Sequence, residues 1–483
     1  GGTDDYYANV YIFEWDGTNN SVGDYKWRSD NLYWGGWQGV AVGDSDGDGK
    51  LEIVVGDDYA DGHTYVYEYS GSGDISSSNI SYITDLQVSG DDDYVSAIAI
   101  GDTDGDGHGE IIYGSSDSGE NTLHIFESTG DNSWAERVNQ DFYEQGVRAI
   151  ALGDFDGDGH GDIAIGGTSD YVEIIESTGD NSWSRKWYHQ FPNYINSLVA
   201  FDMDEDGKDE IYAGCGDGNV YLIKSTGDDS YSYYTIHSYG SDYPVTEVRV
   251  GNLDGDSYKE LYVGVAYTAS PYGGYGYQLE FTGSDITSQS SYTNSLVYDT
   301  GDADYVFSCG VPLTSYDNDG YMEVFWGEEY YDESGVIYVT ENNNRGQCKV
   351  TLGADGTPTD LSSSNYVNVK GYQCGREISS KVWDGHSWTV WLDVGSTATY
   401  DQTSSASTST HRWYTPSTTY TIPNQNTASH TKVYYEQYWM TFKYTKGNGA
   451  GCTHSTSIPV TYYHEGNSDI GYATESGNSY WVD

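Results

Sequence analysis

The stretch that decides the fold reads GDTDGDGHGEI and spans residues 101–111. Counted from Asp102, aspartates stand at positions 1, 3 and 5, an acidic residue stands at position 9, and glycines stand at positions 4 and 6. Glycine tolerates the left-handed backbone that a tight turn needs. The spacing therefore predicts a loop that gathers several carboxylates around one point.

The same phrase returns at intervals along the chain. Its other copies are GDSDGDGKLEI (43–53), GDFDGDGHGDI (153–163), FDMDEDGKDEI (201–211), GNLDGDSYKEL (251–261) and TSYDNDGYMEV (314–324). In the last two copies Asn252 and Ser315 replace the first acid. The six loops begin at residues 44, 102, 154, 202, 252 and 315. Self-similarity at a period of about 50 residues indicates a repeat architecture.

The chemistry of the loop favours Ca²⁺, which takes six to eight oxygen ligands at about 2.3–2.6 Å. Mg²⁺ keeps more of its own water and fits a loop so rich in carboxylates less well. An EF-hand is excluded because it needs a glutamate at position 12. The first four loops carry Val55, Tyr113, Ile165 and Ala213 there. The alternative for each loop is an Asp/Gly-rich turn without metal, and it is strongest for the last two.

The segments that flank the loops have the composition of strands. A short apolar run precedes each loop, as in residues 95–100, and a β-branched or aromatic run ending in glycine follows it, as in residues 110–114. A third run recurs at residues 65–69, 123–127, 172–176 and 220–224. It leads into a turn, STGDNSW, that is identical at 128–134 and 177–183. Together with a fourth run after the turn, this pattern predicts one four-stranded propeller blade per repeat.

The GD-x-DGDG-x-x-[DE]-I phrase with these flanks resembles the FG-GAP/VCBS repeats of integrin-α-type β-propellers, over roughly residues 1–350. The resemblance implies a structural Ca²⁺ in each loop, with ligands at positions 1, 3, 5 and 9 and a backbone carbonyl at position 7. We expect four such sites and up to six. The candidates in the first four loops are Asp44, Asp46, Asp48, Lys50 and Glu52; Asp102, Asp104, Asp106, His108 and Glu110; Asp154, Asp156, Asp158, His160 and Asp162; and Asp202, Asp204, Asp206, Lys208 and Glu210. The candidates in the last two loops are Asn252, Asp254, Asp256, Tyr258 and Glu260, and Asp317, Asp319 and Glu323.

The chain opens in the middle of a blade. Residues 10–14 match the third run, yet no loop precedes them, so six loops accompany seven third runs. We therefore expect an all-β, seven-bladed propeller over residues 1–355, with its last blade closed by the N-terminal strands. Residues 349–353 and 366–370 are candidates for the missing strands. A truncated chain and a neighbouring subunit that completes the blade are the alternatives.

Residues 356–483 carry no loop of this kind and are rich in Ser, Thr, Tyr and Trp. Alternating runs, such as residues 388–393 and 432–436, predict a β-sandwich. Phrases such as WLDVGS at 391–396 resemble the Ig-like repeats of archaeal and bacterial cell-surface proteins. The end of the chain, residues 481–483, echoes residues 391–393. Together with the unfinished first blade, this echo suggests a spare strand that is donated to a neighbouring copy. The alternative is that both ends only reflect how the chain was cut.

Composition excludes several classes of function. The 483 residues contain 76 Asp or Glu and 20 Lys or Arg, which gives a formal charge of −56. Nucleic acids and anionic membranes would be repelled by such a field. No apolar run reaches the roughly 18 residues that span a bilayer. Aromatic residues make up 15% of the chain, which argues against disorder. Five cysteines without CxxC spacing predict neither a zinc ribbon nor a disulfide scaffold.

No catalytic motif is recognisable, and we expect a protein that is not an enzyme. The preferred hypothesis is an extracellular surface protein stiffened by Ca²⁺, either an adhesion module or a filament subunit joined to its neighbours by strand addition. Its partners would be copies of itself, or surface glycans and proteins. Two alternatives remain open: a carbohydrate-binding propeller that stacks sugars on its Tyr and Trp side chains, and a secreted polysaccharide lyase or hydrolase.

Overall fold

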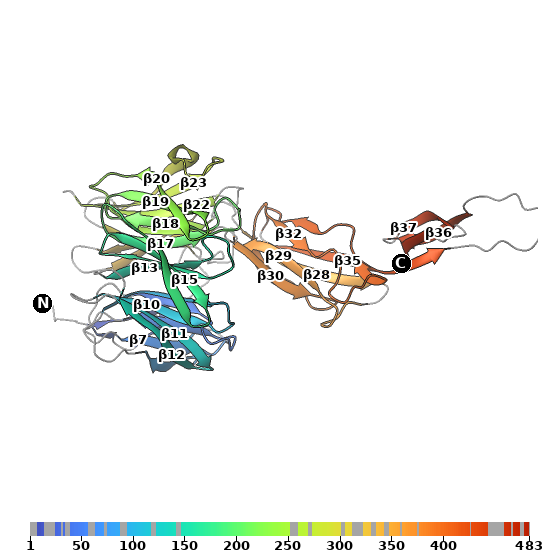
Figure 1. Cartoon of the computed structure of the whole chain (residues 1–483), viewed down its shortest axis with the longest axis horizontal. Coiled ribbons are helices and arrows are strands. Elements are labelled where there is room, and N and C mark those ends of the chain that lie inside the picture. The colour runs from blue at the N-terminus through green and yellow to red at the C-terminus, as the bar shows by residue number, and fades with distance from the viewer. Residues whose placement is uncertain are drawn as a thin grey trace, which may run out of the picture. The chain divides into compact units, whose positions relative to one another are not determined.

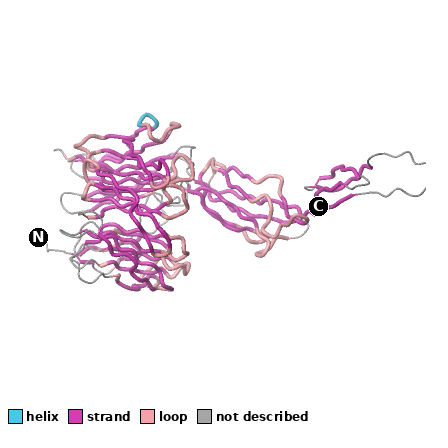
Figure 2. Tube along the Cα trace, in the orientation of Figure 1, coloured by secondary structure: helices cyan, strands magenta, loops and turns pink. Residues whose placement is uncertain are grey.

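The computed structural model shows an all-β chain (Figures 1 and 2). It describes residues 7–13, 25–29, 32–33, 39–56, 63–71, 75–86, 94–116, 122–141, 146–251, 259–268, 273–300, 305–311, 322–329, 335–341, 347–357, 360–373, 376–425, 427–442, 458–464, 467–473 and 478–482. Within these residues the only helix is the 3₁₀ turn η1 (Gln289–Ser291). The described residues contain no helical segment with the length and hydrophobicity of a bilayer span.

The chain divides into two compact units. The first comprises Gly1–Gly251, Tyr258–Val311 and Val324–Glu341, and the second comprises Asn252–Ser257, Pro312–Glu323 and Asn342–Asp483. The main division therefore follows Glu341, whereas the sequence placed a boundary at residue 355. Each unit is described by itself below.

Five four-stranded antiparallel sheets make up most of the first unit, and their strands follow one another in chain order. We number these sheets as blades. Blade 1 contains β5 (Val40–Gly43), β6 (Leu51–Gly56), β7 (Thr64–Tyr69) and β8 (Ile80–Asp85); blade 2 contains β9 (Tyr94–Gly101), β10 (Glu110–Ser116), β11 (Thr122–Gly130) and β12 (Ser133–Asp141); blade 3 contains β13 (Val147–Gly153), β14 (Asp162–Gly167), β15 (Tyr171–Gly179) and β16 (Ser182–Gln190); blade 4 contains β17 (Ile195–Phe201), β18 (Glu210–Cys215), β19 (Asn219–Gly227) and β20 (Ser230–Ser238); blade 5 contains β21 (Val245–Gly251), β22 (Lys259–Tyr267), β23 (Gly273–Phe281) and β24 (Tyr292–Asp299). The predicted four-stranded repeat is confirmed for these five blades.

Three smaller sheets complete the described part of the first unit. They are β25 (Tyr305–Gly310) with β26 (Glu323–Glu329) and β27 (Gly335–Glu341), β2 (Tyr11–Phe13) with β3 (Tyr25–Arg28), and β1 (Tyr7–Ala8) with β4 (Leu32–Tyr33). The run expected at residues 10–14 thus forms β2, and its partner is the strand that follows it in the chain.

Apolar side chains fill the space between successive blades. One cluster joins Val172 and Ile174 of blade 3 to Ile195, Leu198 and Ile211 of blade 4. All six residues of β14 are buried, as are all six of β18, because the second strand of each blade is covered on both faces. Burial of apolar area on this scale is the main force that holds blades together.

A glycine near the end of the second strand lets the next blade approach closely in blades 1 to 4. A Cβ atom at Gly114 would lie 2.3 Å from the Cβ of Val147, the first residue of the next blade. At Gly166 it would lie 2.8 Å from Cγ2 of Ile195. In these four blades the glycine that ends the second run is therefore required by packing between blades.

The second unit contains two sheets with a common core. The first sheet has the order β31 (Trp388–Asp393), β28 (Gln347–Thr357), β35 (Thr427–Phe442), β33 (His411–Tyr414), with β38 (Asn478–Val482) also paired to β35. The second has the order β30 (Arg376–Val382), β29 (Val367–Gln373), β32 (Thr397–Tyr400), β34 (Thr419–Thr421). Val350 and Leu352 of the first sheet belong to the same buried cluster as Val367, Val369 and Tyr400 of the second. A separate hairpin joins β36 (Ile458–His464) to β37 (Asn467–Ala473).

Two expectations about spare strands were wrong. Residues 349–353 and 366–370 do not complete a blade, because β28 pairs with β31 and β35, and β29 pairs with β30 and β32. The C-terminal residues Trp481 and Val482 lie in β38, which pairs antiparallel with β35. They are used within this chain, so they are not a spare strand.

Candidate metal centres in the repeat loops

Each of the first four loops connects the first and second strands of a blade, as between β9 and β10. The turn depends on glycine at positions 4 and 6, where Gly105 and Gly107 have φ values of 77° and 92°. Left-handed backbone of this kind costs a residue with a side chain about 1 kcal/mol or more. In the fourth loop Glu205 occupies position 4 with a φ of 60°.

The acid at position 1 closes the loop on itself. In the second loop Asp102 Oδ1 accepts a hydrogen bond from the Gly105 N–H at 2.8 Å, and its Oδ2 accepts one from Gly107 at 3.0 Å. Asp44 and Asp154 make the same pair of contacts in the first and third loops. The loop therefore holds its shape through its own backbone donors.

The acid at position 9 is buried and only half satisfied. Glu110 is fully buried, and its Oε2 accepts hydrogen bonds from the Thr103 N–H at 2.6 Å and the Thr103 hydroxyl at 2.8 Å. Its Oε1 is buried without a hydrogen-bond partner. The same is true of Glu52 Oε1 and Asp162 Oδ1 in the first and third loops. A buried polar atom without a hydrogen-bond partner lowers the stability of the fold by roughly 1–3 kcal/mol, so a ligand bound to each of these oxygens would be stabilising.

Burial also raises the pKa of these position-9 acids. The pKa is about 7 for Glu52 and Glu110 and about 8 for Asp162, with the neighbouring loop aspartates adding to the effect. A positive ion bound among the carboxylates would remove this penalty.

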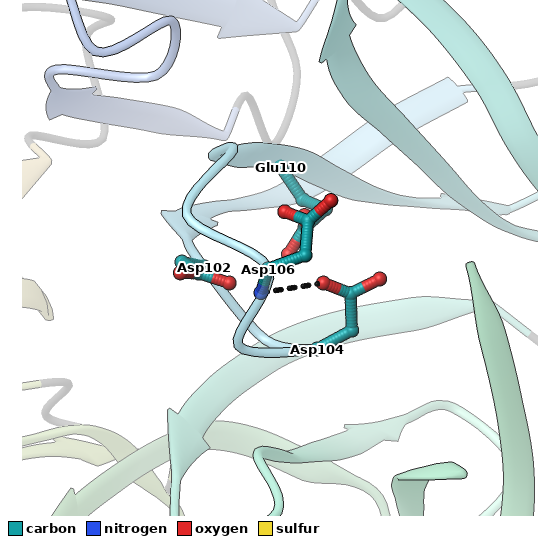
Figure 3. Close-up of side chains that lie close together, drawn as sticks. All are labelled: Asp102, Asp104, Asp106 and Glu110. Carbon is teal, nitrogen blue, oxygen red and sulfur yellow. Dashed lines mark hydrogen bonds between the residues drawn. The ribbon is translucent and has the colours of Figure 1, made fainter. Parts of the chain in front are cut away.

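The carboxylates converge on one point. In the second loop, oxygens of Asp102, Asp104, Asp106 and Glu110 all lie within 4.8 Å of one another (Figure 3). Asp44, Asp46 and Glu52 form such a group in the first loop, and Asp154, Asp156 and Asp162 do so in the third. All of these donors are oxygens, which fits a hard cation such as Ca²⁺ and does not fit a thiophilic metal.

The next blade contacts each of these loops. The turn between β11 and β12 places Asn132 against the first loop, where its N–H donates to Asp46. Asn181 of blade 3 donates to Asp104 at 2.7 Å, and Asp229 of blade 4 donates to Asp156 at 2.8 Å. All three turn residues have φ near 55°, which directs the backbone N–H toward the loop. The position-3 acid therefore belongs to a contact between blades, which sequence reasoning missed although the STGDNSW turn was visible.

The fourth loop differs from the first three. Its position-9 acid, Glu210, accepts from the Met203 N–H at 2.9 Å, but its other oxygen accepts from Lys224 Nζ at 2.5 Å. Lys224 also donates to Asp204 at 3.1 Å and to Asp206 at 2.9 Å. A lysine ammonium thus lies among the carboxylates that the sequence assigned to a metal. Lys224 ends one of the recurring third runs, but its direction could not be read from the pattern.

Residues at position 7 play different parts. The side chain of Lys50 forms ion pairs with Asp48 at 2.5 Å and Glu68 at 2.8 Å. Lys208 reaches the carbonyl of Asp156 in the preceding loop. The N–H groups of His108 and His160 donate to Asp106 and Asp158. The expected role of these four carbonyls as ligands stays a prediction.

The last two loops lie mostly outside the described residues. The candidates that lie outside the described residues are Asn252, Asp254, Asp256, Tyr258, Asp317 and Asp319. Glu260 and Glu323 are described, and both are buried at the start of a strand, as Glu110 is.

Comparison with known proteins identifies the repeat. The FG-GAP-like repeat model matches residues 46–113, 102–165, 154–213 and 202–263. Sqt1 from Chaetomium thermophilum is similar in structure, with a TM-score of 0.41 and 14% identity over 70% of this chain and 77% of that chain. BBS1N in complex with ARL6DN, soaked with lead, has a TM-score of 0.39 and 12% identity over 63% of this chain and 91% of that chain.

At these TM-scores neither likeness bears on the function of this chain. No curated protein matches it. The family matches agree with the structure, since each runs from one loop to the second strand of the following blade. Over residues 46–263 this chain therefore consists of FG-GAP-like repeats, which form blades of a β-propeller.

Proposed function

We propose that the first three loops bind Ca²⁺ and that the protein is a calcium-stabilised, non-enzymatic component of a cell surface. The observation that carries this proposal is the buried, unpartnered carboxylate oxygen at position 9 of each loop. Glu52, Glu110 and Asp162 are buried beside two or three further carboxylates in every case. A cation bound there would satisfy the buried oxygen and reduce the repulsion in the cluster.

The proposed location at the cell surface follows from the calcium affinity that is expected of such loops. Extracellular calcium modules bind at roughly 10⁻⁴–10⁻³ M. At about ten times Kd each independent site adds RT ln 11, or about 1.4 kcal/mol, so three sites add about 4 kcal/mol. That contribution is comparable to the net stability of a small domain. Calcium at millimolar concentration outside the cell would keep such sites filled.

Absence of catalysis is part of the proposal. Strongly raised carboxyl pKa values often mark acid–base catalysts. Here the raised values of Glu52, Glu110 and Asp162 belong to structural loops that are also bonded to their own backbone. Incubation with acidic polysaccharides should give no cleavage products, and a measurable turnover would contradict this part.

We further propose a seven-bladed ring and an Ig-like second unit. The five complete blades, the three-stranded sheet β25–β27 and the pair β2–β3 supply seven sheets for such a ring. Two sheets around one core, with β28 and β35 parallel, support an Ig-like unit. Among the described residues β27 pairs only with β26, which leaves one edge for an added strand from a neighbouring copy.

Two measurements test the proposal. Thermal unfolding of the full chain in millimolar Ca²⁺ and in chelator should differ by many degrees, and equal melting temperatures would refute calcium stabilisation. Electron microscopy over a range of protein concentrations tests assembly. Filaments or oligomers would support a role as a filament subunit, whereas monomers at every concentration would exclude it and leave the adhesion module.

A further inference from the structure

Lys224 lies where a metal ion would have to lie in the fourth loop. Its Nζ is within hydrogen-bond distance of Asp204, Asp206 and Glu210, three of the four acids at positions 1, 3, 5 and 9 of that loop. Burial acts to lower the pKa of Lys224, but the hydrogen bonds to Glu210 and Asp206 outweigh it and raise the pKa. The ammonium therefore stays charged among these oxygens.

The equivalent residue is acidic in the other three blades. The position-9 acid pairs across the sheet with Glu68 in blade 1, Glu127 in blade 2 and Glu176 in blade 3. In blade 4 the pairing of Ile211 with Ile223 places Glu210 opposite Lys224. Among these four blades, the third-strand residue opposite the position-9 acid is therefore negatively charged in blades 1 to 3 and positively charged in blade 4.

A second position has changed with it. In blades 2 and 3 a base on the fourth strand forms an ion pair with the third-strand glutamate, Arg137 with Glu127 and Lys186 with Glu176. Each base lies two residues after the residue that pairs with that glutamate. The equivalent residue in blade 4 is Tyr234, because Lys224 pairs with Ser232. The positive charge lies on the fourth strand in blades 2 and 3, whereas in blade 4 it lies on the third strand, where it contacts the loop.

The consequence is seen at the position-9 acid. Both oxygens of Glu210 have a hydrogen-bond partner, Met203 and Lys224, whereas one oxygen of Glu52, Glu110 and Asp162 has none. A divalent ion at the fourth loop would have to displace the ammonium and would meet its repulsion. The fourth loop therefore does not fit calcium as the first three do.

We propose that Lys224 is a built-in cation that replaces the metal ion in the fourth loop, so that blade 4 is held together without calcium. The inference rests on the proposed function, since it presupposes that the other loops bind the ion. It reduces the number of calcium sites expected in the first four loops from four to three.

A matched pair of isosteric variants tests the inference. Bound calcium is measured on the full chain by equilibrium dialysis, with Glu110→Gln compared with Glu210→Gln. We expect Glu110→Gln to lose one ion per chain and Glu210→Gln to lose none. If both variants lose one ion, the fourth loop binds calcium and the inference is overturned. If Glu110→Gln loses none, the proposed function itself fails.

A gain of binding provides the second arm. The double variant Lys224→Glu/Tyr234→Arg rebuilds in blade 4 the arrangement of blades 2 and 3. It should bind one more ion than the wild type, and the chelator should then lower its melting temperature further. Lys370→Glu, an exposed charge reversal in the second unit, is the control and should bind the wild-type number. A folded double variant that gains no ion would contradict the inference.

Discussion

At the scale of single residues, two loops with acids at the same four positions have different surroundings. Asp102 and Asp202 make similar contacts with their own loops, and Glu110 and Glu210 are equally buried. The difference comes from one side chain on the neighbouring strand, Glu127 or Lys224. The loop spacing could be predicted from the sequence because it is local. The residue opposite position 9 could not, because it depends on the register between two strands.

The first prediction concerns position 3 of the loop. Asp46→Ala should lower the melting temperature more in calcium than in chelator, because in calcium it also loses one ion, worth about 1.4 kcal/mol at ten times Kd. Asp204→Ala is the matched control, since Asp204 contacts Lys224. Its effect should be the same in both buffers. Differential scanning fluorimetry of the two variants checks both statements.

The second prediction concerns pH. The folded pKa values of Glu52 and Glu110, about 7, and of Asp162, about 8, lie above those of the unfolded chain, so the folded state binds more protons in this range. Stability in chelator should therefore fall as the pH rises from 6 to 8. Calcium requires the ionised acids and should weaken or reverse this trend.

Melting temperatures in chelator at pH 6 and pH 8 check the pH prediction. The triple variant Glu52→Gln/Glu110→Gln/Asp162→Asn should show a smaller dependence between these two values, and what remains should include Glu210, whose pKa burial also raises to about 7. An unchanged dependence in the triple variant would assign it to other groups.

At the scale of the elements, contacts between blades decide which residues are tolerated. The strands themselves follow from alternating and apolar runs, and the sequence predicted them for blades 1 to 5. It could not show that Gly114 faces Val147 or that Asn181 caps the loop of the preceding blade, because these contacts cross between repeats. Glycine at the end of a strand can serve a turn or a close approach, and only the packing tells which.

The third prediction tests this close approach. Gly114→Ala should destabilise the first unit by about 1–3 kcal/mol, because its Cβ would lie 2.3 Å from the Cβ of Val147. Gly310→Ala in β25 is the control, since its Cβ would meet only Phe325 Cβ at 3.9 Å. Chemical denaturation of both variants should separate them clearly. Equal stability would show that the blades move apart at little cost.

At the scale of the whole molecule, the two units have separate cores and different needs. The blade clusters involve the repeat strands, whereas Val350, Val369 and Tyr400 belong to a core of the second unit. Composition alone indicated that the chain changes character after the last loop. It could not show that residues 349–353 join the second unit, because an isolated alternating run carries no information about its partners.

The fourth prediction follows from this separation. The described loops that we propose as calcium sites all lie in the first unit, so a chelator should lower only the unfolding transition of that unit. Hydrogen exchange should become faster in β9–β18 and stay unchanged in β28–β35. Calorimetry with and without chelator measures the transitions. A joint shift of both would mean that the units unfold as one.

The contact between each of the first three loops and the following blade also bears on the order in which these loops are completed during synthesis. Asp46 is met by a residue 86 positions further along the chain, Asp104 by one 77 positions further, and Asp156 by one 73 positions further. The chain is synthesised from its N-terminus, so the contact to the position-3 acid of a loop cannot form until the hairpin of the next blade has been synthesised. Ions would therefore be captured one repeat behind the growing end. In blade 4 the positive charge is Lys224, which belongs to the same blade as the loop, so the loop acids could be neutralised without an ion.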